Sequence, residues 1–141
     1  MLVLALDTAT TDLVAGLAEV PDPASPTSCE VIAESVTATR AHNELLVPTV
    51  TQLLQGAGRA FADIDAIVVG CGPGPFTGLR VGMATASAFG QALGVPVHGV
   101  VTHDAVAALL DAPSALVVTD ARRREVYWAR YDAGARVDGP D

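Results

Sequence analysis

Two aspartates end apolar segments and could hold the metal ion of a nucleotide. Asp7 follows the apolar residues 2–6 (LVLAL), and Asp120 ends the similar segment ALVVTD. Carboxylate oxygens are ligands that magnesium and calcium prefer, so this pair would suit an ATP-dependent enzyme if the fold placed them across a cleft. The turn after Asp7, however, has Ala9 where close phosphate approach favours glycine. We therefore expect both carboxylates to cap turns and keep the enzyme as the alternative.

The glycine-rich residues 72–80 (GPGPFTGLR) are a second place where phosphate could bind. A P-loop needs a lysine, and all eight basic residues of the chain are arginines. Phosphate cradles are built from backbone N–H groups, which Pro73 and Pro75 lack. Gly74 keeps its donor and is a candidate cofactor-binding residue, and Thr77 is placed to cap the following helix. The pattern favours a stiff connector that sets the direction of that helix.

A stripe of small residues follows this connector. Gly78, Gly82, Ala86, Gly90 and Gly94 are spaced by four, which places them on one face of a helix. Glycine costs a helix about 1 kcal/mol relative to alanine, so its repeated use predicts very close approach of another backbone. Packing on the chain's own sheet and tight contact with another subunit both remain open.

Histidine and cysteine form no catalytic or metal-binding pattern. His98 and His103 are five residues apart, which is the wrong step for one helical face. Cys29 and Cys71 are isolated, whereas a zinc site needs about four ligands, so we expect two reduced, small core residues. His42 is expected near a helix start. The sequence thus predicts no catalytic residue, no cofactor and no metal site.

Charge argues against direct binding of nucleic acid. Sixteen acidic residues against eight basic ones give a net charge of −8, and affinity for nucleic acid comes largely from neutralised phosphates. Three arginines at 122–124 stand beside Tyr127, Trp128 and Tyr131 and could contact RNA by charge and stacking. Tyr127 and Trp128 point to opposite faces of a strand, so one of them should be core. We expect the arginine turn to serve a partner surface.

Apolar patterning predicts the elements that position these residues. Residues 2–6 indicate a strand buried on both faces, and residues 13–20 and 29–36 indicate two more strands in an antiparallel meander. Prolines make residues 21–28 a loop. Helical spacing begins at His42 and continues to about Ala57, where Pro48 either lies near the helix start or bends it.

The remaining elements alternate between strand and helix. Residues 66–70 indicate a strand, 78–93 a helix, 94–100 a short strand and 102–110 a third helix. Together with the meander, this order (β-β-β-α-β-α-β) predicts a mixed α/β sheet.

The last part of the chain repeats the plan of its beginning. Residues 115–132 read as an apolar strand, a terminal aspartate, a polar turn and a second strand, as residues 2–20 do. We expect a first lobe over residues 1–112 and the beginning of a second, shortened lobe over residues 113–141. The opening has no basic leader and no apolar stretch is long enough to span a membrane, so we expect a cytoplasmic protein.

Three motifs carry a resemblance to a known family. ALDTAT, DAIVVGCGPGPFTGLRVGMATA and TDARRREVYWARYD occur in this order and closely resemble the TsaB (YeaZ) family of tRNA threonylcarbamoyladenosine biosynthesis subunits. The middle motif is the specific one, since GPGPFTGLRVG is similar to the family's GPGSFTGLRIG. The resemblance covers nearly the whole chain, is weakest across residues 21–28 and lacks most of the second lobe.

The resemblance implies an actin/Hsp70-like ATPase fold with a ribonuclease H-like first lobe, and a non-catalytic scaffold subunit. Its implied partners are a TsaD-like catalytic subunit, which modifies the adenosine next to the anticodon, a TsaE-like ATPase reached through the complex, and a second copy of the chain. tRNA would be contacted only indirectly, and no membrane is implied. An ATP-binding phosphotransferase that uses Asp7 and Asp120 is the alternative, and a metallopeptidase ranks last.

The implied contact with the partner uses two helices, at about residues 44–57 and 78–93. The expected interface residues are Leu46, Val50, Leu53, Gly78, Gly82, Met83, Ala86 and Gly90.

Overall fold

The computed structural model comprises residues 1–141 and describes all of them except residues 22–23, 25–28 and 122. The first part of the chain forms β1 (Leu2–Asp7), β2 (Asp12–Glu19), β3 (Glu30–Ala38), α1 (His42–Gly56), the short 3-10 helix η2 (Phe61–Asp63), β4 (Ala66–Gly70), α2 (Phe76–Leu93) and β5 (Val97–Val100). The rest forms α3 (Thr102–Ala107), β6 (Ser114–Asp120), β7 (Val126–Asp132) and β8 (Ala135–Asp138). The predicted loop at residues 21–28 lies largely outside the described residues.

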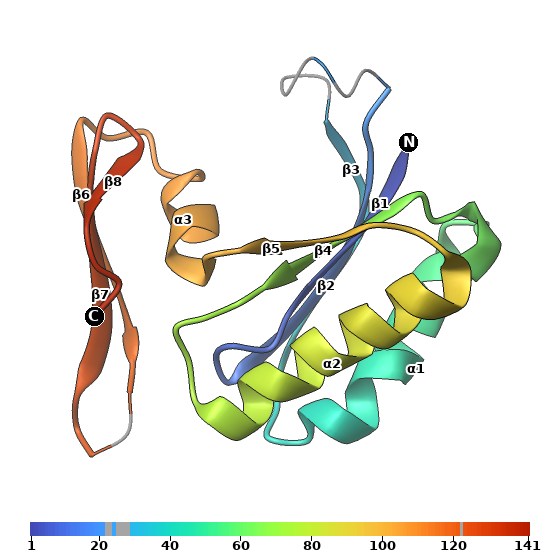
Figure 1. The fold of residues 1–141 in the computed structure, drawn as a ribbon, viewed down its shortest axis with the longest axis horizontal. Coiled ribbons are helices and arrows are strands. Elements are labelled where there is room, and N and C mark those ends of the chain that lie inside the picture. The colour runs from blue at the N-terminus through green and yellow to red at the C-terminus, as the bar shows by residue number, and fades with distance from the viewer. Residues whose placement is uncertain (22–23, 25–28, 122) are drawn as a thin grey trace.

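These elements build two sheets. Five strands in the order β3-β2-β1-β4-β5 form the first sheet, and β6-β7-β8 form the second. Figure 1 shows α1 and α2 side by side on one face of the first sheet, with α3 between the first and second sheets. The predicted antiparallel meander is confirmed in β1–β3, and β4 and β5 add to it in parallel. The predicted mixed α/β sheet is therefore confirmed.

The main core lies between the first sheet and helices α1 and α2. Alternate residues of β1 point into it, and Leu2, Leu4 and Leu6 are each at most 2% exposed. Ala5, on the other face, is exposed. The prediction of a strand buried on both faces is therefore wrong for β1, because no described helix of the chain covers that second face.

Helix α1 runs through its proline. Pro48 is the seventh residue of α1 and lies on its exposed side, where a proline costs a helix one backbone hydrogen bond. The apolar residues Leu46, Val50 and Leu54 keep the helix on the sheet, since all three are at most 2% exposed. The stabilisation from burying these three side chains therefore outweighs the loss of one backbone hydrogen bond at Pro48.

The second sheet has its own small core with α3. Ala107 of α3 packs with Val117, Ala129 and Tyr131. Tyr131 is the aromatic core residue, whereas Tyr127 and Trp128 are both half-buried, so the expectation that one of these two is core was wrong. Strand β8 was not predicted, and α3 ends three residues before the predicted limit at residue 110.

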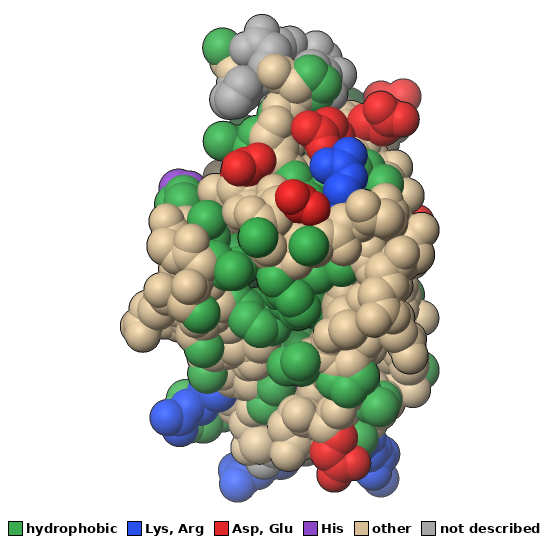
Figure 2. All heavy atoms as spheres, turned by 90° about the vertical axis from the view of Figure 1, so that its right-hand side faces the viewer, with side chains coloured by type: hydrophobic (Ala, Val, Ile, Leu, Met, Phe, Trp, Pro, Cys, Tyr) green, Lys and Arg blue, Asp and Glu red, His purple; other side chains and the backbone are tan. Residues whose placement is uncertain are grey.

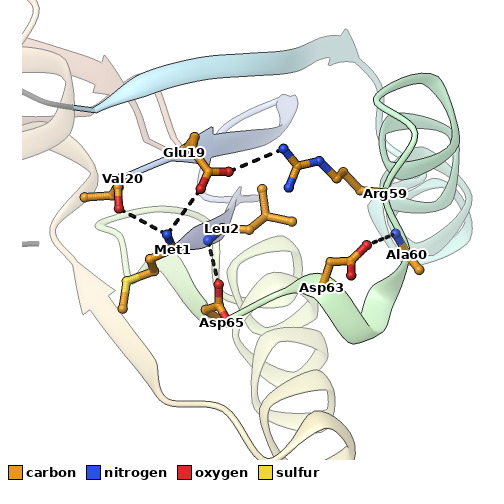
Figure 3. A network of polar contacts seen from close by, with 8 residues as sticks. All are labelled: Met1, Leu2, Glu19, Val20, Arg59, Ala60, Asp63 and Asp65. Carbon is orange, nitrogen blue, oxygen red and sulfur yellow. Dashed lines mark hydrogen bonds and ion pairs between the residues drawn. The ribbon is translucent and has the colours of Figure 1, made fainter. Parts of the chain in front are cut away.

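A polar network closes the amino end of the first sheet (Figure 3). The terminal amino group of Met1 lies 3.2 Å from Glu19 Oε1, and Arg59 lies 3.5 Å from the other oxygen of Glu19. The amide of Leu2 donates to Asp65 Oδ2 at 2.8 Å. The side chains of the ion pairs are 31–41% exposed, so each pair adds at most about 1 kcal/mol, and the network mainly fixes strand ends.

No helix among the described residues is long and apolar enough to cross a membrane.

Candidate functional site

A cleft lies at the carboxyl end of β1, between the two sheets. Its cavity volume is about 840 Å³. Hydroxyl groups dominate its polar lining, with Thr8, Thr10, Thr11, Thr39, Thr77 and Thr119 among the residues around it. The ionisable lining residues are Asp12, Arg40, His42 and Asp120. The cleft therefore combines many hydroxyl groups with a nearly balanced set of charges.

The two aspartates singled out from the sequence are placed differently. Asp120 lines the cleft, and Asp7 is not among the lining residues. Asp7 accepts the amide of Ala9 at 2.8 Å with one carboxylate oxygen and the hydroxyl of Thr102 at 3.0 Å with the other. Both oxygens of Asp7 are thus used to hold the following turn and α3, in agreement with the expectation of a turn-capping carboxylate.

The connector before α2 packs against the turn after β1. A Cβ atom on Gly74 would overlap the backbone carbonyl of Ala9, so only glycine allows this approach. Gly72 accepts the amide of Thr102 at 2.8 Å. Gly74 lines a separate, smaller hollow of about 380 Å³ and not the cleft that holds Asp120. The three candidate cofactor residues, Asp7, Gly74 and Asp120, therefore do not line one common cavity.

Helix α2 begins earlier than predicted, and Thr77 does not cap it. The helix starts at Phe76 with Pro75 before it, and no side-chain hydrogen bond caps this end. The fixed backbone angle of proline suits a position at a helix start, which moves Thr77 into the first turn. The capping role expected for Thr77 is thus wrong.

The stripe of small residues on α2 packs against the chain itself. Gly82, Ala86 and Gly90 are buried, and a Cβ atom on Gly82 would lie 2.5 Å from the Thr8 hydroxyl. A Cβ atom on Gly90 would overlap the side chain of Val97. Of the two readings left open by the sequence, packing on the chain's own sheet is the one that the burial supports.

Most of the residues expected at a partner interface are therefore core residues. Five of the eight are buried residues on the inner sides of α1 and α2: Leu46, Val50, Gly82, Ala86 and Gly90. Leu53 and Gly78 are half-buried, and Met83 is 41% exposed. Periodicity correctly places the buried residues of each helix on one face, and that face points inward, whereas Met83 lies on the exposed side.

The outward side of the same two helices carries exposed apolar residues instead. Leu45 and Val47 on α1 are 37% and 45% exposed, and Phe76 and Met83 on α2 are 68% and 41% exposed. The guanidinium of Arg80 lies 4.8 Å from the ring centre of Phe76. Residues 45–56 and 81–93 contain no charged side chain. We call the exposed side of α1 and α2 the outer helical face.

Figure 2 views the side of the molecule that lies at the right of Figure 1, toward which both helices extend. Hydrophobic side chains gather in its centre, and the charged side chains lie toward its upper and lower ends. Sequence reasoning missed Leu45, Val47 and Phe76 as surface residues. The uncharged stretches 45–56 and 81–93 in two successive helices were the signal that could have found them, because a helix exposed to water on one face normally carries charges there.

The three histidines lie in different surroundings. His42 begins α1 as expected, and its Nε2 lies 2.9 Å from the carbonyl oxygen of Thr10. His98 is exposed on β5, and His103 is fully buried on α3. Within the described parts of the chain, no group of three His, Cys, Asp or Glu residues could hold a metal ion.

Both cysteines are free and exposed. The expectation that Cys29 and Cys71 are core residues is thus wrong. Cys71 follows β4 at the sheet end, with its Sγ 3.3 Å from the carbonyl oxygen of Val100, and Cys29 precedes the edge strand β3.

Helix α3 joins the second sheet through buried polar contacts. His103 Nε2 lies 2.8 Å from Thr119 Oγ1, and His103 Nδ1 is buried without a hydrogen-bond partner. Burial lowers the pKa of His103 below its ordinary value, and nearby Asp104 opposes this shift. Asp104 accepts the hydroxyl of Tyr131 and pairs with Arg136 at 3.2 Å. No local pattern in the sequence indicates this cluster, because the partners of His103 and Asp104 lie at least 16 residues further along the chain.

The architecture places the chain in a broad structural class. YeaZ from Pseudomonas aeruginosa has a TM-score of 0.78 and 30% sequence identity, over 96% of this chain and 63% of that one. RuvC from Thermus thermophilus shares the fold alone, with a TM-score of 0.52 and 17% identity over 77% of this chain and 69% of that one. The first sheet and its helices thus form a lobe of the actin/Hsp70-like, ribonuclease H-like class.

Sequence comparison narrows this class to a family. The family model described as TsaD, tRNA N6-adenosine threonylcarbamoyltransferase, matches residues 30–139. The tRNA threonylcarbamoyladenosine biosynthesis protein TsaB of Escherichia coli is 36% identical over 96 residues, which are 65% of this chain and 42% of that protein. The chain belongs to the TsaB (YeaZ) family.

More similar relatives come from mycobacteria. An uncharacterised protein of Mycobacterium tuberculosis is 54% identical over 139 residues, which are 98% of this chain. The chain spans 63% of the length of that relative.

Proposed function

We propose that this chain is a non-catalytic accessory subunit in the biosynthesis of tRNA threonylcarbamoyladenosine, and that it acts by binding and supporting a TsaD-type catalytic subunit. Membership of the TsaB (YeaZ) family supports the pathway. The observation that carries the proposed mode of action is the outer helical face, which exposes apolar side chains and has charged residues only near the starts of the two helices, at Glu44 and Arg80.

The energetics of this face favour a protein partner. Fully burying a side chain such as Val, Met or Phe contributes roughly 1.5–3 kcal/mol, and Val47, Met83 and Phe76 are all more than 40% exposed. Contiguous apolar patches on soluble proteins mark contact sites. Two adjacent helices that expose apolar side chains can pack against two helices of a partner, as in a helical bundle. A second copy of the chain would compete for the same face.

Co-purification with the TsaD-type subunit of the same organism tests the proposed interface. Val47→Asp on the outer helical face should abolish the complex, because a buried, unpaired carboxylate is costly. Val137→Asp on β8 is the matched control, since the two valines are 45% and 48% exposed, and it should leave the complex intact. Retention of the complex by the Val47 variant would show that the partner binds elsewhere.

The same proposal gives the other components indirect roles. A TsaE-type ATPase would join through the catalytic subunit, and tRNA would be held by a more basic partner, because the net charge of −8 opposes phosphate binding.

The cleft favours a second candidate, an ATP-binding phosphotransferase. Its volume of about 840 Å³ suits a small ligand, and Asp120 lies on its wall. Calorimetry with Mg-ATP separates the two candidates: binding that Asp120→Asn removes would support the enzyme. Absence of binding at millimolar nucleotide would leave the accessory role as the better description.

A further inference from the structure

One buried histidine lies between the two sheets and takes no part in the proposed function. His103 is the second residue of α3, the helix between the sheets (Figure 1), and it is fully buried. Its Nε2 lies 2.8 Å from Thr119 Oγ1 on β6. Its Nδ1 is also buried and has no hydrogen-bond partner among the described residues. This position suits a neutral ring, because a charged ring donates from both nitrogens and is costly to bury without acceptors.

The charged residue next to His103 is already engaged. Asp104 accepts the hydroxyl of Tyr131 and pairs with Arg136 at 3.2 Å. Its negative charge is therefore balanced by the guanidinium of Arg136, and one of its oxygens is used by two partners. Asp104 thus offers a protonated His103 a weak electrostatic benefit and no hydrogen bond.

The acidic groups on the neighbouring strands do not supply the missing acceptor either. Asp7 on β1 uses one oxygen for the hydroxyl of Thr102 and the other for the turn after β1. Asp120 follows Thr119 on β6, so its side chain is directed to the other face of the strand. The titratable and charged groups on the elements around His103 are Asp7, Asp104, Asp120, Tyr131 and Arg136.

Protonation of His103 is therefore coupled to release of its contact with β6. Burial lowers the pKa of His103, and nearby Asp104 opposes this shift. The ordinary pKa is near 6.5, so a state in which the ring is exposed takes up a proton at a higher pH than the folded state does. The stability that the neutral ring gives to this contact is complete above about pH 6.5 and is lost as the pH falls through the lowered pKa.

The same contact holds part of the wall of the cleft. Thr119 and Asp120 line the cleft of about 840 Å³ together with Thr8 and Gly78 from the first sheet and α2. On the other side of α3, Thr102 bonds to the first sheet without involving His103. Loss of the bond to Thr119 therefore frees the second-sheet wall of the cleft while α3 stays on the first sheet.

We propose that His103 is a proton-sensitive latch between α3 and the second sheet. While the ring is neutral, it holds Thr119, and with it one wall of the cleft, against α3. When the ring is protonated, the contact opens and this wall loosens, so that the cleft responds to acid. The latch is independent of the outer helical face and of the proposed accessory role.

Hydrogen exchange of the whole chain as a function of pH tests the latch. The amides of Ala105 and Ala108 report on α3, since they donate to Val101 and Asp104. Their protection factors, which correct for the intrinsic effect of pH on exchange, should fall several-fold between pH 7.5 and 5. The fall is limited to about tenfold for each pH unit below 6.5. The amides of the β1–β2 ladder are the internal reference and should keep their protection.

Two matched variants assign the effect to one histidine. The side-chain amide of His103→Gln can still bond to Thr119 and does not titrate, so this variant should show equal protection of α3 at both pH values. His98→Gln is the control: it removes an exposed histidine on β5 and should show the same fall as the original protein. Circular dichroism at pH 7.5 checks that both variants are folded.

Two results would overturn the proposal. A fall in protection that persists in His103→Gln would assign it to another group, and equal protection of the original protein at both pH values would show that no latch opens. If His103→Gln does not fold, NMR titration of the histidine rings in the original protein decides, with the ring signals of His42 and His98 assigned by their glutamine variants. We expect the His103 ring to titrate below 6.5, and titration at or above 6.5 would overturn the latch.

Discussion

At the scale of single residues, Thr8 shows how the glycines of α2 are used. Its hydroxyl donates to the carbonyl of Gly78 at 2.6 Å and accepts the amide of Gly82 at 3.0 Å. Thr8 is 1% exposed, so the contact brings the turn after β1 directly onto the helix backbone. The glycines therefore make room for a neighbouring side chain and serve the packing of the lobe.

Gly82→Ala should destabilise the protein. A Cβ atom there would lie 2.5 Å from the Thr8 hydroxyl, and such overpacking typically costs about 1–3 kcal/mol, more than the gain of about 1 kcal/mol in helix propensity. Chemical denaturation should show a lower free energy of unfolding. Gly56→Ala is the control, because nothing lies within 4 Å of its added Cβ, and it should be neutral or slightly stabilising. Equal stability of the two variants would contradict this account of the stripe.

The buried hydroxyl group of Tyr131 leads us to expect that the protein loses stability at high pH. Burial, with the hydrogen bond to Asp104, raises the pKa of Tyr131 to about 12 from the ordinary value near 10. The folded state thus favours the neutral phenol, and this contribution is complete below pH 10 and is lost as the pH rises toward 12. Denaturation as a function of pH should show the decline, and Tyr131→Phe should remove that part of it. An unchanged alkaline decline in the variant would assign it to other groups.

At the scale of elements, the sequence predicts most of the fold because burial leaves periodic patterns. The strands β1–β4 and helices α1 and α2 follow from apolar runs or helical apolar spacing, with bounds that shift by at most two residues. β8 was missed because its four residues, ARVD, are all exposed and carry no such pattern. The inward position of the small-residue stripe was not predictable either. Spacing shows which residues share a helical face. Only the tertiary structure shows whether that face packs on the chain's own sheet or is open to a partner.

Helix α1 offers an element-scale prediction. Pro48 lies in the helix interior, exposed to solvent, where proline is about 3 kcal/mol less favourable than alanine. Pro48→Ala should therefore raise the midpoint of thermal unfolding, by an amount that corresponds to about 1–3 kcal/mol. Thermal unfolding followed by circular dichroism measures it. A lower midpoint would mean that the proline ring makes a stabilising contact at the surface.

At the scale of the whole molecule, α3 ties the two sheets together. Thr102, its first residue, bonds to Asp7 of the first sheet and to the carbonyl of Gly72 before α2. The next residue, His103, bonds to Thr119 of the second sheet. Local sequence patterns contain no trace of these contacts, since they join residues up to 95 positions apart. The relative position of the two sheets is thus the part of the structure least accessible to sequence reasoning.

Thr102→Val tests this link between the two sheets. Valine keeps the volume of threonine and removes the hydroxyl that donates to Asp7 at 3.0 Å, and a carboxylate oxygen left without its partner costs about 1–3 kcal/mol. We expect faster hydrogen exchange at the amides of Ala9 and Thr102, on the two sides of the lost bond, while the β1–β2 ladder exchanges as before. Thr102→Ser keeps the donor and should exchange like the original protein. If the valine and serine variants exchange alike, the connection between the two sheets depends on the backbone bond from Thr102 to Gly72 and not on Asp7.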